Sequence, residues 1–289
     1  MRKNKNLQGK TVNLCFEGGG IRGLCYVGVA KALEKHLVTS KRLIGSSAGS
    51  IFAGLLAVNA SSSFLEQEVM NTDFNNFMDG WGWKLGISYR LWYKMGMYNG
   101  DYFVDWYGAL LKKLTGNADI TIGDIYTVYN KELIITTTDL NNKKTVYLSY
   151  KNEPDMPVRK AVRMSMSLPY VYVPIHYKCV YYIDGGYLNN YPIDYLDTNY
   201  PNEESIGFRL MGGEGVIDCH NLNLNILTLN LLESAIERIE YLETREDDID
   251  RTVEIDTGNL VCTDFNIDNK TKIVLIKNGF DATDSFLSG

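Results

Sequence analysis

Residues 43–52 of this 289-residue chain are LIGSSAGSIF, which is a short apolar run, a tight turn and the start of an apolar helical segment. The turn matches G-x-S-x-G, with Gly45, Ser47 and Gly49 at the defined positions. Between a strand and a helix, such a turn forces the serine into a strained, exposed position at the positive end of the helix. The pattern therefore predicts Ser47 as a nucleophile. A flexible turn without chemistry is the alternative, because the motif also occurs by chance.

A second segment of the same kind precedes this one. The apolar run at residues 11–16 leads into the glycines at 18–20, and apolar residues then recur at helical spacing. Two strand–turn–helix units in succession predict parallel strands with helices on the faces of the sheet, which is an α/β fold. Further elements are expected as strands at 131–140, 143–150, 178–184, 204–210 and 251–258, and as helices at 156–169, 221–250 and 269–287.

Bulk properties narrow the class of protein. A net charge of −6 disfavours a nucleic-acid binder. The five cysteines stand singly, and together with the lack of a signal peptide they favour a reducing, intracellular location. No apolar stretch reaches the roughly 18 residues of a membrane span. The three histidines are expected in different places: His36 on a helix surface, His176 in a strand-like run and His220 in a polar loop. They lie far apart without the spacing of metal ligands, so no metal site is predicted.

A serine nucleophile needs a base, and Asp184 is a better candidate than any of the three histidines. Asp184 ends the apolar run YYID, and in a parallel sheet the carboxyl ends of strands carry the ligand sites. Gly185 and Gly186 allow a sharp turn directly after it. A carboxylate is a weak base, with a reference pKa of about 3.9, yet it accepts a serine proton where the site stabilises the new charge. An Asp-Gly hairpin turn is the alternative interpretation.

The first glycine-rich loop has two interpretations. Gly18, Gly20 and Gly23 match G-x-G-x-x-G, which is typical of a dinucleotide-binding turn. That function needs an acidic residue about 20 positions later, where this chain has the serine turn instead. The consecutive glycines Gly18, Gly19 and Gly20 suit a concave nest of N–H groups for the oxyanion of an attacked ester, with Arg22 adding positive charge. We therefore favour an oxyanion hole.

Three motifs in order, GGGIRG, GSSAG and DGG, resemble those of the patatin-like phospholipases. The segments ELIITTTDL, AVRMSMSLPYVYVP and DGGYLNNYP are also similar, so that the resemblance covers roughly residues 9–210, and NGFDATDSFL resembles the closing helix of the family. The resemblance implies a three-layer α/β/α sandwich with a mainly parallel sheet. It further implies a calcium-independent lipid acyl hydrolase of the phospholipase A type, with no cofactor and a Ser47–Asp184 dyad.

The resemblance also assigns roles to the neighbouring positions. Gly45 and Gly49 correspond to the nucleophile elbow, and Gly18, Gly19, Gly20 and Arg22 to the oxyanion hole. Gly185, Gly186 and Asn190 correspond to supporting positions after the aspartate, and Asn190 and Pro192 are expected to shape the site without taking part in the chemistry.

No linker or repeat divides the chain, so one catalytic domain is predicted over residues 1–289. Its core spans 9–210, interrupted by a helical insertion at about 64–117 without a convincing strand. A helical extension follows at 211–289. The acidic residues at 246–250 are expected on a solvated face.

The insertion is rich in aromatic residues, with eleven between Phe77 and Tyr107, including all four tryptophans. These residues could form a channel for an acyl chain, lie at a membrane surface, or pack as ordinary core. In the membrane interpretation, the cations of this segment would meet anionic head groups: Lys84, Arg90 and Lys94.

The leading hypothesis is therefore a serine esterase that acts on membrane phospholipids or other acyl lipids, with peripheral membrane contact. The main alternative is a nucleotide- or flavin-binding α/β protein that uses the Gly18–Gly23 loop. A non-catalytic lipid-binding relative and a histidine-dependent hydrolase are weaker alternatives.

Overall fold

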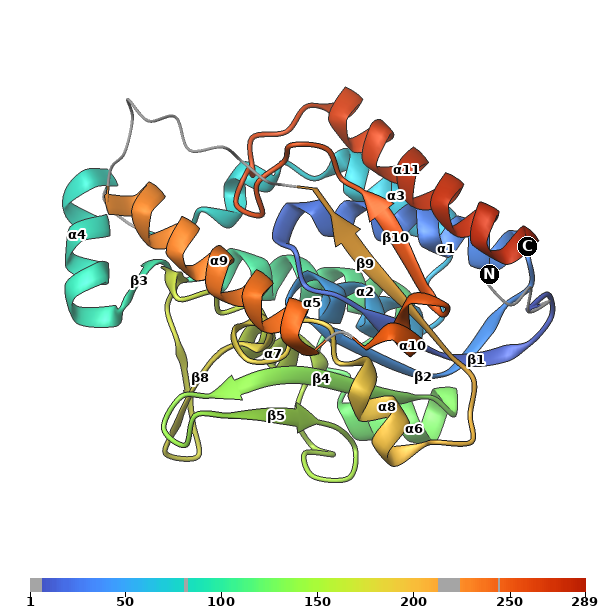
Figure 1. Ribbon diagram of the computed structural model, residues 1–289. Coiled ribbons are helices and arrows are strands. Elements are labelled where there is room, and N and C mark those ends of the chain that lie inside the picture. The colour runs from blue at the N-terminus through green and yellow to red at the C-terminus, as the bar shows by residue number, and fades with distance from the viewer. Residues whose placement is uncertain (1–6, 81–82, 213–223, 244) are drawn as a thin grey trace.

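A mixed sheet forms the centre of the molecule in the computed structural model, which describes residues 7–80, 83–212, 224–243 and 245–289 (Figure 1). Its strands are β1 (Thr11–Phe16), β2 (Thr39–Ser46), β4 (Glu132–Asp139), β5 (Lys144–Leu148), β7 (Ile175–Tyr177), β8 (Val180–Asp184), β9 (Ser205–Met211) and β10 (Thr252–Asp256). Their order is β10-β9-β1-β2-β4-β8-β7, and β5 pairs with β4 outside this path. Neighbours from β10 to β4 are parallel, whereas β5 and β8 run antiparallel to β4, and β7 antiparallel to β8.

Helices cover both faces of the sheet (Figure 1). They are α1 (Tyr26–Lys35), α2 (Ala48–Ala57), α3 (Ser62–Asn71), α4 (Trp83–Lys94), α5 (Asp101–Thr115), α6 (Ile122–Tyr129), α7 (Val158–Ser165), α8 (Ile193–Asn199), α9 (Leu224–Glu243), α10 (Glu246–Ile249) and α11 (Asn269–Ser288). Short 3-10 helices are η1 (Gly20–Cys25), η2 (Phe74–Phe77) and η3 (Gly185–Tyr187). Among the described helices, none is both long enough and apolar enough to cross a bilayer.

Alternate side chains of the central strands enter two hydrophobic layers of unequal size. On one side, strand residues join the main core with α1, α2, α5, α7 and α11: Leu14, Phe16, Leu43, Leu133 and Ile135. On the other side, strand residues join a small cluster around α8: Cys15, Ile44, Ile134, Tyr191, Ile193 and Leu196. The alternation follows from the two-residue period of a strand. It confirms the predicted three-layer α/β/α sandwich with a mainly parallel sheet.

The direction of β8 differs from the parallel arrangement on which the prediction for Asp184 relied. β5 occupies one edge of β4 from Ile135 to Asp139, so β2 and β8 must share the other edge. On that edge β2 pairs as far as Thr136, and β8 runs in the opposite direction and ends opposite Thr137. The carboxyl ends of β2 and β8 therefore meet end to end on β4.

The insertion contains one strand that the sequence did not predict. β3 (Gly96–Tyr98) pairs in parallel with β6 (Tyr170–Tyr172), outside the main sheet. Three residues are too few to show a period-two pattern, and the partner strand lies far away in the chain. The expectation that residues 64–117 hold no strand is therefore wrong.

The C-terminal extension is part of the sandwich and not an appendage. β10 extends the sheet beside β9, and the predicted closing helix, α11, packs along α1 (Figure 1). The acidic segment departs from the predicted solvated face at Asp248, which is 3 % exposed and forms an ion pair with Arg251. Burying the carboxylate is tolerated because this arginine compensates its charge.

Candidate active site

Ser47 stands on a sharp turn between β2 and α2. It is the N-cap residue of α2 and adopts φ 48° and ψ −123°, a backbone conformation that L-residues rarely take. A Cβ atom at Gly45 would lie 2.4 Å from the carbonyl carbon of Gly49, and a Cβ at Gly49 would lie 2.2 Å from the carbonyl oxygen of Phe16. Both flanking positions therefore need glycine, as expected for a nucleophile elbow.

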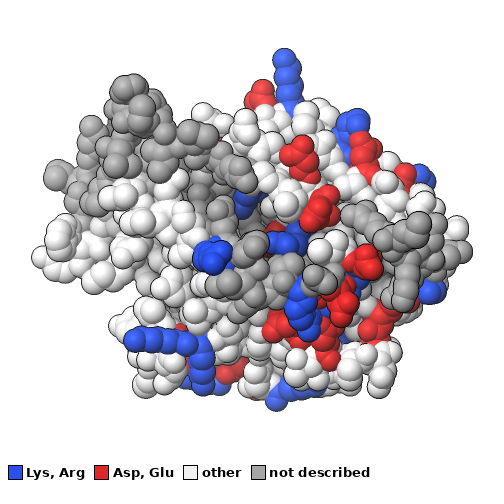
Figure 2. Space-filling view, in the orientation of Figure 1, with Lys and Arg blue, Asp and Glu red and all other residues white. Residues whose placement is uncertain are grey.

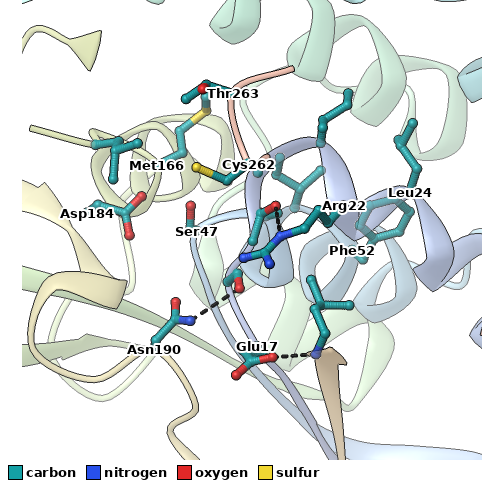
Figure 3. A pocket seen from close by; sticks show the side chains of 18 of the residues that line it. Glu17, Arg22, Leu24, Ser47, Phe52, Met166, Asp184, Asn190, Cys262 and Thr263 are labelled. Atoms are coloured by element: carbon teal, nitrogen blue, oxygen red, sulfur yellow. Dashed lines mark hydrogen bonds between the residues drawn. The ribbon is translucent and has the colours of Figure 1, made fainter. Parts of the chain in front are cut away.

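Asp184 reaches Ser47 because of the end-to-end arrangement on β4. Ser46 pairs with Thr136, and Asp184 pairs with the next residue, Thr137. The carboxylate of Asp184 points toward the Ser47 side chain in Figure 3. The gap between the two strand ends is tight, since a Cβ at Gly185 would lie 2.3 Å from the carbonyl oxygen of Thr136.

The environment of Asp184 makes its carboxylate a better base than an exposed one. The residue is 2 % exposed, and its Oδ1 accepts a 2.8 Å hydrogen bond from the Gly186 N–H. Burial raises the pKa of Asp184 to about 7, against smaller lowering effects of the Ser47 hydroxyl and the Gly186 amide. Its Oδ2 is buried and has no hydrogen-bond partner among the described residues, so its approach to the Ser47 hydroxyl is longer than a formed hydrogen bond. Such loose contacts are common before a substrate binds.

Asn190 joins the Asp-Gly-Gly turn to the first glycine loop. Its Nδ2 donates a 3.2 Å hydrogen bond to the Gly18 carbonyl, and its own carbonyl accepts one from the Gly18 N–H, also at 3.2 Å (Figure 3). A Cβ at Gly18 would lie 3.0 Å from the Ser47 Cβ, which shows how closely the loop approaches the serine. Asn190 thus ties the glycine loop to the turn that follows Asp184.

The N–H groups of the glycine loop are not equivalent. The Gly18 N–H is already bonded to Asn190, so it is not free to stabilise an oxyanion, and this differs from the predicted role. Within the described part of the chain, the N–H groups of Gly19 and Gly20 have no acceptor. Arg22 contacts the loop itself: its Nε lies 3.4 Å from the Gly19 carbonyl oxygen. The arginine therefore braces the loop next to the two free donors.

A cavity of about 650 Å³ opens directly at these groups. Ser47, Asp184, Gly19 and Gly20 line it at one point. Most of the remaining lining is apolar and comes from α2, α3, η2, α5 and the segment after α7, including Phe52, Leu55, Leu65, Val69, Phe77, Trp106, Leu110, Leu168 and Val171. Space of this size and chemistry suits a hydrocarbon chain beside the serine.

Comparison with known proteins identifies the family. The model of the family described as patatin-like phospholipase matches residues 14–197, which is more than half of the chain. The chain belongs to this family. The predicted resemblance is thereby confirmed, and so is the prediction of a lipid hydrolase at the level of the family.

Relatives of this patatin-like chain that align over most of their length include an uncharacterized protein of Acanthamoeba polyphaga mimivirus, 29 % identical over 92 % of this chain and 90 % of the relative. The uncharacterized protein YqhO of Bacillus subtilis is 28 % identical over 94 % of this chain and 96 % of the relative. Among solved structures, VipD from Legionella pneumophila matches with a TM-score of 0.67 at 18 % identity, over 97 % of this chain and 67 % of that chain. The structural likeness supports the patatin-like fold.

The aromatic insertion of this patatin-like chain divides into two parts. Phe77 and Trp106 line the cavity, and Phe103 and Tyr107 are fully buried beside them. These residues combine two of the predicted roles, channel wall and core. Other aromatic residues, on α4, are exposed.

The predicted role of the insertion's cations in head-group binding fails for Arg90. Arg90 is only 6 % exposed, and its Nε donates a 2.7 Å hydrogen bond to the Met97 carbonyl, so it holds α4 against β3. Lys94 is exposed at the end of α4. The side chain of Lys84 lies outside the described residues.

None of the described histidines of this patatin-like chain lines the cavity. The Nε2 of His36 lies 2.7 Å from Asp284 on α11, so the ring is partly buried in a helix–helix contact and not on an open helix surface as predicted. His176 is exposed on β7, where its ring lies tilted against that of Tyr181. His220 lies outside the described residues.

Two supporting residues of this patatin-like site were not found from the sequence. Ser165 of α7 accepts a 2.9 Å hydrogen bond from the Ser47 N–H and donates one of 2.6 Å to the Thr136 carbonyl, which fixes the elbow to β4. Arg163 is 3 % exposed and bonds to the carbonyls of Asn99 and Val173 and to the hydroxyl of Ser167, whose carbonyl accepts the Asp184 N–H. Both stand in the segment AVRMSMSLP, whose likeness to the family was noted, but no motif marked either side chain.

Proposed function

We propose that this chain hydrolyses fatty acyl esters of phospholipids or related lipids, without calcium, through a Ser47–Asp184 dyad and an acyl-serine intermediate. The observation that carries the proposal is the meeting of β2 and β8 on β4. It brings a strained serine and a buried carboxylate together at one point of an apolar cavity. A serine, a base, two free amides and a hydrocarbon-sized space are the parts that lipid ester hydrolysis requires.

In the first half-reaction, the Ser47 Oγ attacks the ester carbonyl carbon while Asp184 Oδ2 takes the hydroxyl proton. The negative charge that develops on the carbonyl oxygen is stabilised by the N–H groups of Gly19 and Gly20. The bond from carbon to the alcohol oxygen then breaks. Asp184 gives its proton to the departing alcohol, and the acyl group stays on Ser47.

In the second half-reaction, a water molecule attacks the acyl-serine carbonyl and Asp184 takes its proton. The second tetrahedral intermediate uses the same two amides. Ser47 Oγ leaves with the proton from Asp184, and the free fatty acid departs. The raised pKa of Asp184 suits both directions of proton transfer, because a pKa near the working pH favours a group that alternately accepts and donates.

The names of relatives support the substrate class. A protein of invertebrate iridescent virus 6 named "Probable lipid hydrolase" is 24 % identical over 66 % of this chain and 65 % of the relative. Lysophospholipase NTE1 of Debaryomyces hansenii is 27 % identical over 67 % of this chain, which corresponds to 11 % of that much longer protein. The nucleotide- or flavin-binding alternative gains no such support, and the apolar lining next to the glycine loop argues against it.

We also propose an intracellular location. Three cysteines of the described residues are free thiols: Cys15, Cys25 and Cys179. Unpaired thiols are typical of a reducing compartment.

A fluorophosphonate probe tests the proposed mechanism directly, because it reacts with an activated serine. We expect peptide mapping to find the label on Ser47, and the Ser47→Ala variant to remain unlabelled. Hydrolysis of a phospholipid substrate should persist in excess EDTA. A label on another serine, or activity that chelation abolishes and calcium restores, would refute the proposal.

A further inference from the structure

Helix α4 exposes three aromatic side chains and buries its arginine, the reverse of an ordinary surface helix. Tyr89, Trp92 and Tyr93 are 58 %, 79 % and 74 % exposed, and their spacing places them on one side of the helix. Arg90 is 6 % exposed and bonds to the Met97 carbonyl. The outer side of α4 is therefore apolar although it lies at the surface of the molecule.

Further apolar side chains extend this surface. We define the aromatic patch as Tyr89, Trp92 and Tyr93 together with three exposed residues of neighbouring segments: Met78, Met95 and Tyr170. Met95 directly precedes β3, and Gly96 of β3 pairs with Tyr170 of β6, so the segments are adjacent. Figure 2 shows the end of the molecule that carries α4 without coloured charged atoms on its described surface. Apart from Lys94 at the end of α4, the patch is uncharged, and an exposed apolar patch of this kind marks an interaction site.

The aromatic patch is continuous with the wall of the active-site cavity. Met78 follows Phe77, which lines the cavity, and Tyr170 precedes Val171, which also lines it. In each pair one residue points outward and the next points into the cavity. A hydrocarbon chain that leaves an apolar phase at the patch would thus stay in contact with apolar side chains on its way toward Ser47.

We propose that the aromatic patch is a docking face for the surface of a lipid bilayer. Tryptophan and tyrosine favour the boundary between hydrocarbon and head groups, where their rings are buried and their polar atoms remain hydrated. Lys94 at the end of α4 is exposed and lies where a cation would meet lipid phosphates. A bilayer fits better than a protein partner because the patch continues into a cavity for acyl chains. That last step rests on the proposed function.

Sedimentation with phosphatidylcholine vesicles tests the docking face. The triple variant Tyr89→Ser/Trp92→Ser/Tyr93→Ser should bind vesicles about tenfold more weakly than the unmodified chain, since three amphipathic rings are removed. Raising the salt concentration should have little effect, because the face is nearly uncharged. The control is Tyr126→Ser/Val128→Ser on α6, which removes two exposed apolar side chains outside the patch and should bind normally.

Activity assays separate this proposal from the proposed function. The triple variant should hydrolyse a short soluble ester such as p-nitrophenyl butyrate within about twofold of the unmodified rate, and vesicle phospholipid about tenfold more slowly. Ser47→Ala should bind vesicles normally, so its binding tests docking alone. Equal sedimentation of the triple variant and the unmodified chain would overturn the docking face. A patch that instead joins two copies of the chain, shown by halving of the molar mass in the triple variant, would overturn it as well.

Discussion

The catalytic edge and the aromatic insertion are built in different ways. At the catalytic edge, where β2 and β8 meet, the positions of Ser47 and Asp184 follow from backbone pairing with two consecutive residues of β4. In the insertion, the orientation of each side chain depends on contacts between distant segments, such as β3 with β6. In the proposed function, the edge carries the ester chemistry, whereas the insertion selects the molecule that reaches it.

This difference indicates where substitutions should separate chemistry from selectivity. Changes at the edge should lower turnover for every ester. Changes in the insertion should alter the preferred chain length or the access from a membrane, and leave a short soluble ester unaffected.

The largest effect is expected at the dyad itself. Ser47→Ala and Asp184→Asn should each lower ester hydrolysis about 10⁴-fold or more, because nucleophile and base act as one unit. The assay should use both p-nitrophenyl butyrate and a phospholipid, since the loss must be the same for both. Single changes of His36, His176 and His220 to alanine serve as controls, and complete loss in one of them would exclude a two-residue dyad.

The pH profile offers the next largest effect. Asp184 must be ionised to accept the serine proton, and burial raises its pKa to about 7. Activity should therefore fall as the pH drops below 7, to about one hundredth of its plateau value at pH 5, since each unit lowers the ionised fraction about tenfold. Measured kcat/KM for a soluble ester between pH 5 and 9 gives the midpoint. A midpoint near 4 would show that the base is an exposed carboxylate.

Ser165 tests whether the elbow is held in position from α7. Ser165→Ala leaves the Ser47 N–H without its acceptor, and the cost of an unpaired buried amide predicts a loss in kcat of about 10- to 100-fold, with little change in KM. Ser149→Ala is the matched control, because it removes a buried hydroxyl that accepts a hydrogen bond from the Lys151 N–H and does not line the cavity. If both variants lose the same activity, the role of Ser165 is general stability and not positioning.

The smallest effect is expected in the insertion. Leu110→Phe on α5 adds bulk to the cavity wall and should lower kcat/KM for long-chain esters about tenfold. This is the loss in kcat/KM expected when one or two methylene groups of the chain no longer fit the pocket. Hydrolysis of a short ester should be unchanged. Leu114→Phe on the same helix, outside the cavity wall, is the control. Equal loss for short and long esters would show that insertion and edge are not separable.

The sequence predicted the features that depend on local motifs, and it did not predict those that depend on contacts between distant segments. Ser47 and Asp184 stand in short motifs whose geometry is local. The α/β class followed from two strand–turn–helix units, and the three-layer sandwich from the resemblance to the family. The direction of β8 was not predictable, because the apolar run before Asp184 is equally compatible with either direction. The Gly18 N–H is occupied because it bonds to the carbonyl of Asn190, more than 170 residues later. The burial of Arg90 depends on Met97 accepting its hydrogen bond, which no helical pattern reveals.

The end-to-end meeting of β2 and β8 has a consequence for insertions and deletions. Ser46 and Asp184 pair with adjacent residues of β4. One residue gained or lost between Thr136 and Thr137 would therefore move Asp184 by about 3.3 Å along the strand. It would also place the side chain of every later residue of β4 on the opposite face of the sheet. The far end of β8, toward Val180, has no such constraint. Length variation among functional relatives should therefore collect in the β7–β8 hairpin and spare the middle of β4.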